Sequence, residues 1–329
     1  MLRFFKGTGP GVIMLFLLTA GLLWFNSFRE PMPPGLTAGY QHMILFHLVQ
    51  KFAGNHYLAA TITAFILLLV LSGIIINFNT RTFFINERTF LPGVLYLILT
   101  SILPVWQNLN PLIPASIFLF LAVVRITGTY RRGGVAYSFY DAALMISIGS
   151  LFYTNLIWYG ILLFIGMLLL RTFDLREVAI SLLGLITPYV FVFGIYYIAD
   201  LDMGELTTTI SSGLFGQSPD MEWSRFFIVT GAFIVVTLLT ASVHLMSVFT
   251  TKKVKSRKVF SLQIWMAVVT IVLFFVSPSA SDELIYILAM PASYILSHYY
   301  INIRRKKIVP EIMFTGTLLL AVLLHFFEI

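Results

Sequence analysis

Cysteine is absent from the 329 residues of this chain, and charged residues are scarce, at 11% of the sequence. The absence of cysteine excludes a disulfide framework and any metal site built on thiolates. A soluble domain carries about 25% charged residues, so a chain that is 59% hydrophobic has too little polar surface for water. A mean hydropathy of +0.92 instead predicts a helical protein in lipid, because helices satisfy their own backbone hydrogen bonds.

Long apolar runs fill most of the sequence and predict an all-α, polytopic transmembrane bundle that forms a single domain over residues 1–329. One helical span needs about 20 apolar residues, and on that criterion we expect about eleven spans. The first of them has no small-residue cleavage site after it, so we expect it to be retained. The expected spans are 9–26, 57–78, 91–107, 111–127, 136–152, 155–171, 178–199, 225–248, 259–276, 284–301 and 310–327.

Positive charge is distributed unevenly over the loops that join these spans. With a cytoplasmic N-terminus, only Arg29, Lys51 and Arg225 among the 21 lysines and arginines fall outside. Cytoplasmic loops carry an excess of Lys and Arg, so the pattern predicts the N-terminus inside and the C-terminus outside, in a multi-pass protein of the bacterial cytoplasmic (inner) membrane. The formal charge of +7 is then explained by topology and anionic lipid. We expect membrane lipid as a partner and no nucleic acid.

Two outer segments are long enough to carry a site, 27–56 and 200–224. The first contains an expected interfacial helix at 36–53 and the stretch FREPMPPG, which holds Glu30, the only acid among the first 86 residues. One hypothesis makes Glu30 a general base that faces a lipid-linked substrate at the membrane surface. The other makes it a solvated turn residue that pairs weakly with Arg29.

Asp141 is the only acid well inside an expected span, and Arg125 near the end of the preceding span is its expected partner. An ionisable residue at membrane depth is costly and usually functional. Two hypotheses stay open for this intramembrane pair: a structural ion pair at the inner interface, or a proton or ion site centred on Asp141.

The six histidines do not form a metal motif. His42 and His47 are five residues apart, whereas helical metal pairs are three or four apart so that both rings face one way. The chain also has no phosphate-binding loop, nucleophile elbow or zinc-protease motif. We therefore expect neither a metal nor a cofactor.

Several stretches resemble an uncharacterised family of polytopic bacterial inner-membrane proteins of similar length. They are MLRFFKGTGPGVI, INFNTRTFFINERTFLPGVLYLILTSILPVW, NLNPLIPASIFLFLAVVRI, IGSLFY and LLRTFDLREVAISLLGLITPYVF. The resemblance extends over nearly the whole length of the chain, and no activity follows from it.

More distantly, the layout is similar to that of the GT-C membrane glycosyltransferases, which use sugars linked to lipid phosphates at the outer face. That resemblance implies a catalytic acid in the first outer loop, where Glu30 stands. It also implies that Arg29, His47, Lys51 and Arg225 bind the substrate phosphate. The first loop lacks the paired acids of a DxD-like motif, and the outer cations are few.

Three functions follow from these features. The first is a GT-C-like transferase, or a relative, that acts on a polyprenyl-phosphate-linked glycan at the outer face. The alternative is a non-catalytic subunit of a cell-envelope membrane complex, which docks on protein partners through its helices and outer loops. The third is a transporter that uses Asp141.

Overall fold

A computed structural model describes residues 2–32, 43–53, 56–131, 136–170, 174–217, 225–303 and 308–327. Every regular element in these ranges is a helix, so the all-α class is confirmed. The long helices are α2 (Pro10–Arg29), α4 (Tyr57–Thr82), α9 (Leu175–Ile198), α11 (Arg225–Ser247), α12 (Val254–Val276), α13 (Ile285–Asn302) and α14 (Ile308–Phe327). The shorter ones are α1 (Leu2–Phe5), α3 (Ile44–Ala53), α5 (Leu91–Thr100), α6 (Leu112–Gly128), α7 (Ala136–Ser150), α8 (Ile161–Leu170) and α10 (Met203–Phe215), with 3₁₀ turns η1 (Pro104–Trp106), η2 (Thr154–Gly160) and η3 (Asp282–Leu284).

The expected number of about eleven spans is not supported. Seven helical stretches of the described residues are long and apolar enough to cross a membrane, and the segments expected at 91–107, 111–127, 136–152 and 155–171 form shorter helices. Proline lacks a backbone donor and Asn and Ser side chains compete for backbone hydrogen bonds, which explains why α5 ends before Pro104. All ten residues of α5 are buried, so this helix is covered by protein rather than by lipid.

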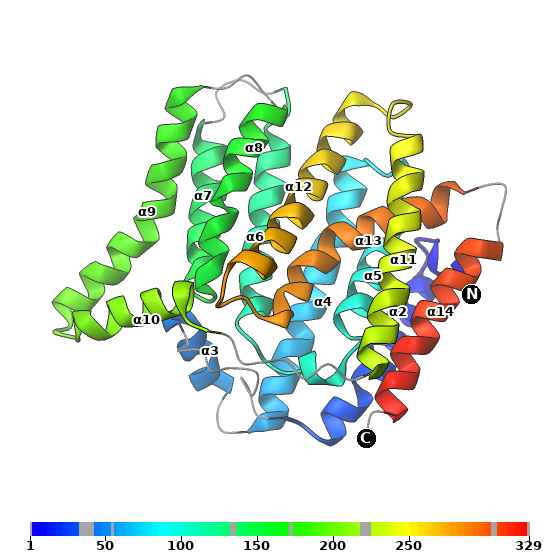
Figure 1. Ribbon diagram of the computed structural model, residues 1–329, viewed down its shortest axis with the longest axis horizontal. Helices are drawn as coiled ribbons and strands as arrows, with labels where there is room; N and C mark the ends of the chain where they lie inside the picture. The colour runs from blue at the N-terminus through cyan, green and yellow to red at the C-terminus, as the bar shows by residue number, and fades with distance from the viewer. Residues whose placement is uncertain are drawn as a thin grey trace.

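The helices form a bundle with α5 and α13 near its centre (Figure 1). Helix α13 packs against α5, α11 and α12, while α7 packs against α6 and α9. The α7–α9 contact is close because Gly184 has no side chain: a Cβ there would lie 2.8 Å from the Tyr140 carbonyl oxygen. Helices α2 and α14 lie together on the opposite side of the bundle (Figure 1).

The two ends of the bundle differ in composition. At the upper end in Figure 1, α6 and α11 end and α7 and α12 begin; we name it the basic end after Arg125 and the five cations within residues 252–258. At the other end, which we name the α10 end, α2 ends and both α3 and α10 are found (Figure 1).

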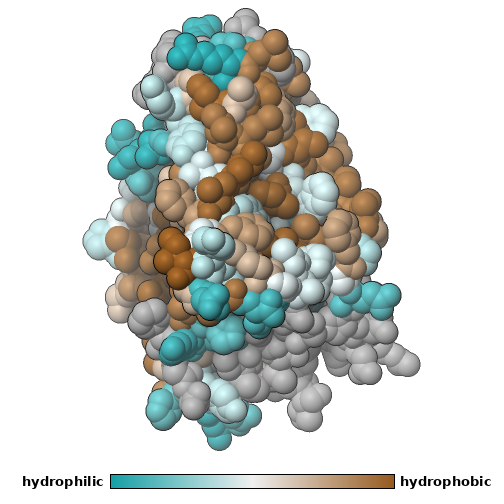
Figure 2. Space-filling model, turned by 90° about the vertical axis from the view of Figure 1, so that its left-hand side faces the viewer, coloured by the Kyte–Doolittle hydropathy of each residue, from teal (hydrophilic) through white to brown (hydrophobic). Residues whose placement is uncertain are grey.

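Apolar side chains cover the outer surface between these ends. Figure 2 shows hydrophobic residues across the middle of the face that α9 presents, with hydrophilic residues gathered above and below them. Leu183, Val190 and Phe191 of α9 are at least 60% exposed. Such a broad apolar surface is costly in water and suited to lipid. The chain therefore has the surface of a multi-pass membrane protein.

Both outer segments contain a helix at the α10 end. The helix expected at 36–53 is present as α3, while residues 33–42 lie outside the described ranges. Residues 203–215 of the segment 200–224 form α10, and residues 218–224 lie outside the described ranges. Asp202 caps the first turn of α10, because the Asp202 carboxylate accepts a hydrogen bond from the Gly204 amide at 2.7 Å.

Candidate functional site

Three segments without regular α-helix meet inside the α10 end: residues 101–111, 151–156 and 277–284. They are rich in Ser, Asn and Pro, which favour turns over continued helix. Most of their residues are buried. Irregular backbone at membrane depth is tolerated only where protein or a water-filled cavity surrounds it. These buried turns are therefore the candidate functional site.

Asn155 connects two of the turns to α10. Its amide nitrogen donates to the Ser279 hydroxyl at 2.8 Å, and that hydroxyl donates to the Leu214 carbonyl at 3.0 Å. Its amide oxygen accepts a long hydrogen bond, 3.5 Å, from Ser277. The Asn155 amide nitrogen also lies 3.3 Å from the Tyr153 hydroxyl. The side chains of Tyr153, Asn155, Ser277 and Ser279 thus form one polar cluster with the Leu214 carbonyl of α10, and we name it the Asn155 cluster.

Two acids of η3 extend this cluster. The Trp106 indole nitrogen donates to Asp282 Oδ2 at 2.5 Å, and the Tyr286 hydroxyl donates to the Trp106 carbonyl at 2.5 Å. Glu283 is 1% exposed. Burial is the main cause that raises the pKa of Tyr153 to about 12, and the Glu283 carboxylate adds to the rise while the Asn155 hydrogen bond opposes it. Tyr153 therefore stays a neutral hydroxyl, able to donate or accept.

Gln107 anchors the first turn to the terminal helices. Its amide oxygen accepts from the Ser27 hydroxyl at 2.5 Å, and its amide nitrogen lies 2.6 Å from His325 Nε2. The same nitrogen donates to the Leu23 and Ser101 carbonyls at 3.1 Å. Because a buried amide without partners would cost about 1–3 kcal/mol, we assign Gln107 and His325 a structural role.

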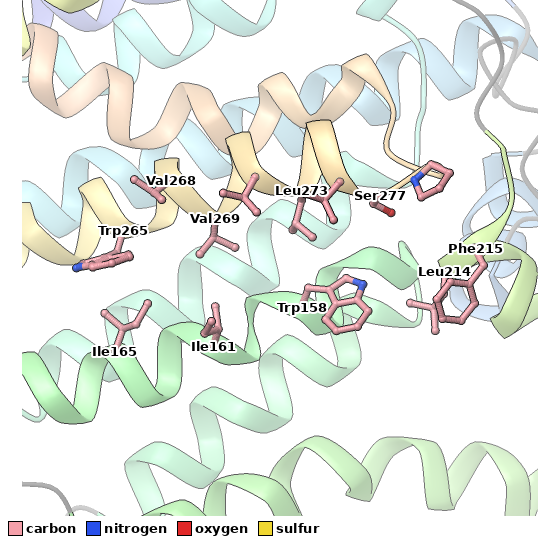
Figure 3. A pocket seen from close by; sticks show the side chains of 13 residues that line it. Trp158, Ile161, Ile165, Leu214, Phe215, Trp265, Val268, Val269, Leu273 and Ser277 are labelled. Carbon is pink, nitrogen blue, oxygen red and sulfur yellow. The ribbon is translucent and has the colours of Figure 1, made fainter.

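An apolar cleft of about 450 Å³ opens next to the Asn155 cluster (Figure 3). Trp158, Ile161 and Ile165 line one wall, and residues of α12 from Trp265 to Val276 line the other. Leu214 and Phe215 of α10 stand at the end where Ser277 lies (Figure 3). Ser277 belongs both to the cleft and to the Asn155 cluster. The cleft is therefore apolar along its length and polar at the end where Ser277 lies.

The residues expected to carry chemistry at the outer face lie at the same end of the bundle, and those whose side chains are described are on its surface. Arg29 and Glu30 are exposed at the end of α2, and the structure records no ion pair between Glu30 and another described residue. His47 and Lys51 are exposed on α3. Arg225 begins α11, and its side chain lies outside the described part of the chain.

Helix α3 is nevertheless held beside the polar turns. The Leu45 amide donates to the Leu151 carbonyl at 3.2 Å, and Met43 and Phe46 are buried. The face that carries His47 and Lys51 therefore stands at the edge of the α10 end.

The expected pair of Arg125 and Asp141 is present at the basic end, where Arg125 Nη1 lies 3.9 Å from Asp141 Oδ2. Both side chains are about half exposed, at 55% and 46%. Neither residue lines the cleft. An ion pair this exposed contributes roughly 0–1 kcal/mol to stability.

Within the described ranges, no three or more His, Asp or Glu side chains come together as a metal site. Sequence reasoning missed Trp106, Asn155, Asp282 and Glu283 as site residues. The available signal was the run SPSASDEL at 277–284, where two adjacent acids follow serines just before a span. Such acids are also typical of helix starts, so the run alone does not indicate a site.

Comparison with known proteins finds a match to one protein family. A model described as "Family of unknown function (DUF6427)" matches residues 39–329, a segment that begins after Glu30. No curated protein and no solved structure matches the chain.

Proposed function

The chain belongs to this family of unknown function, and we propose that it is a GT-C-like transferase, or a relative, that binds a polyprenyl-phosphate-linked glycan. In this proposal the apolar cleft between α8 and α12 holds the hydrocarbon chain, and the Asn155 cluster faces the sugar. The observation that carries the proposal is the continuity of the cleft with that cluster through Ser277.

The size and lining of the cleft support a hydrocarbon ligand. Ligand pockets usually measure roughly 300–1,000 Å³ and are mostly apolar with a few placed polar groups, and this cleft of about 450 Å³ is lined almost wholly by apolar side chains. Its outer surface lies among lipid-facing residues such as Val272, which is 50% exposed. A lipid tail can therefore enter sideways from the bilayer.

The chemistry of the polar end supports a sugar rather than a bare phosphate. The polar side chains next to the cleft are the amide of Asn155 and the hydroxyls of Tyr153, Ser277 and Ser279. The acids Asp282 and Glu283 lie further along the turn that contains Ser277. Carboxylates accept hydrogen bonds from hydroxyl groups, whereas phosphates prefer Arg and Lys. In the proposal the phosphate is held by Arg29, Lys51 and Arg225, with His47 beside them on α3.

The charge pattern supports the sidedness. In the proposal the basic end faces the cytoplasm, because Lys and Arg are retained inside, and the α10 end, with the Asn155 cluster and Glu30, lies at the outer face of the bacterial inner membrane. The N-terminus is then cytoplasmic and the C-terminus outside. Glu30 remains the proposed general base by its position in the first outer loop, and Glu283 is the second candidate because a buried acid is the better-placed group for altered reactivity.

The test is lipid occupancy measured by native mass spectrometry after gentle extraction from the cell's own membrane. We expect a bound mass that matches a polyprenyl phosphate or a lipid-linked sugar. Val272→Trp fills the cleft and should lower that occupancy about tenfold, equivalent to about 1.4 kcal/mol. Val190→Trp is the matched control, since Val190 is also lipid-facing, at 61% exposure, but belongs to α9.

Equal occupancy in both variants would overturn the assignment of the cleft. Extraction with a protein in fixed stoichiometry, and with no such lipid, would favour the alternative, a subunit of an envelope complex.

A further inference from the structure

A second cluster of polar side chains lies at the basic end, away from the cleft. The rings of His244 on α11 and His298 on α13 are 6.0 Å apart between centroids. The ring of Phe260 on α12 contacts both His298 and Lys252. Its centroid lies 5.5 Å from the centroid of the His298 ring and 5.3 Å from the Lys252 ammonium nitrogen. Three helices and the loop between α11 and α12 therefore converge on two histidines and a lysine.

The imidazole groups of this cluster have unmet hydrogen-bonding capacity. His298 is 1% exposed, and neither of its ring nitrogens has a hydrogen-bond partner among the described residues. The same holds for Nε2 of His244. A buried polar group without a partner costs about 1–3 kcal/mol, so native structures supply one from protein, water or ligand.

Lys252 adds a charge for which the described residues supply no counter-charge. Its side chain is 9% exposed, and the structure records no ion pair for it within the described ranges. Burial lowers the pKa of Lys252, as expected when an ammonium leaves water without an acidic partner. An anion bound beside Lys252 would supply that missing partner.

Helix α12 begins next to this lysine. No side chain caps its N-terminus, where Lys253 is the N-cap residue. Free backbone amides at the start of a helix favour negative charge. The amides, the ammonium group and the imidazole N–H groups are all donors, and this combination suits an oxyanion.

We propose that His244, Lys252 and His298 bind a phosphate-type oxyanion where α11, α12 and α13 meet at the basic end. The phosphate belongs to a membrane phospholipid headgroup or to a free phosphate compound. This site lies at the opposite end of the bundle from the Asn155 cluster and does not depend on the function proposed for the cleft.

The test is anion-dependent thermal stability of the full chain. One arm adds inorganic phosphate to protein in neutral detergent, with chloride at equal ionic strength as the reference. The other arm compares lipid nanodiscs of phosphatidylglycerol with nanodiscs of phosphatidylcholine. A melting temperature raised by phosphate in detergent identifies a free anion as sufficient. A rise only in phosphatidylglycerol identifies an anionic lipid headgroup, since the phosphate of phosphatidylcholine is neutralised by its own choline.

Two variants and a matched control make the result specific. Lys252→Met should weaken the apparent affinity for the anion at least about tenfold, since a hydrogen bond to a charged group contributes about 1.5–3 kcal/mol. Lys253→Met removes the same charge from the neighbouring exposed residue and should leave the affinity within about twofold. His298→Phe keeps a ring against Phe260, removes both unpartnered nitrogens and should also abolish the shift.

Without added anion, Lys252→Met should melt no lower than the wild-type protein, because it removes a buried charge for which the described residues supply no counter-charge. This separates lost binding from lost folding. The proposal is overturned if neither arm shifts the melting temperature, which is the result expected if water alone fills the space. It is also overturned if Lys253→Met loses the shift as fully as Lys252→Met.

Discussion

Trp106 and Asp282 are 176 residues apart in the chain and are joined by a 2.5 Å hydrogen bond from the indole nitrogen to Oδ2. The bond ties the turn after α5 to the turn before α13. Tyr286 strengthens the same junction, because its hydroxyl donates to the Trp106 carbonyl. The two turns that carry the buried polar groups of the α10 end are therefore held together by side chains rather than by continuous helix.

Replacing Trp106 with Phe removes this donor while keeping a ring. We expect the free energy of unfolding to fall by about 1–3 kcal/mol, because the partly buried Asp282 carboxylate loses its charge-assisted partner. Chemical unfolding in detergent measures the change. Trp158→Phe is the control: Trp158 is 49% exposed, and its loss should change stability by less than about 0.5 kcal/mol. Equal losses in the two variants would remove the special role of the Trp106–Asp282 bond.

The same substitution at Glu30 and Glu283 separates two candidate acids. In the proposed function, one of them serves the reaction on a lipid-linked glycan, so either Glu30→Gln or Glu283→Gln should lower the rate of glycan transfer about 100-fold or more, the range for a general base. Binding of the lipid should be unchanged in that variant. Transfer at wild-type rate in Glu30→Gln removes Glu30 as the base, and wild-type rates in both variants leave the transferase without a base among these acids.

The exposed ion pair of Arg125 and Asp141 should contribute little to the stability of the protein. A double-mutant cycle with Arg125→Gln and Asp141→Asn should give a coupling energy of roughly 0–1 kcal/mol that shrinks at high salt. A transporter that uses Asp141 would behave differently: transport of its ion or proton would stop in Asp141→Asn. Coupling above about 2 kcal/mol, or loss of such transport, would contradict the structural role that the half-exposed geometry supports.

Replacing glycine with alanine should have opposite effects on stability at Gly184 and Gly194, two positions on α9. A Cβ at Gly184 would lie 2.8 Å from both the Tyr140 carbonyl and the Ala143 Cβ, whereas a Cβ at Gly194 would meet nothing within 4 Å. Gly184→Ala should destabilise the protein by about 1–3 kcal/mol through overpacking between α7 and α9. Gly194→Ala should stabilise α9 by about 0.5–1 kcal/mol. Melting temperatures of the two variants check the sign, and two shifts of the same sign would contradict the packing.

Some features of the fold and the site could be predicted from the sequence, and others could not. The interfacial helix was expected at 36–53, and α3 is present at 44–53, because an apolar run bounded by Gly54 is visible locally. Spans were overcounted for the opposite reason: hydropathy treats 91–107 as continuous, but Pro104 and the polar residues after it turn the chain inside the protein. The pairing of Arg125 with Asp141 was expected because Arg125 is a cation near the end of the span that precedes Asp141, the only acid well inside an expected span.

By itself, the sequence determined the class of this protein and its relation to the membrane. Composition, apolar run lengths and the placement of Lys and Arg are local properties, and they suffice to indicate an all-α polytopic bundle. Only the tertiary structure decided which polar residues meet. Asn155 reaches Ser279, and His244 comes to lie beside His298, because helices far apart in the chain pack together, and no local pattern records which faces they share.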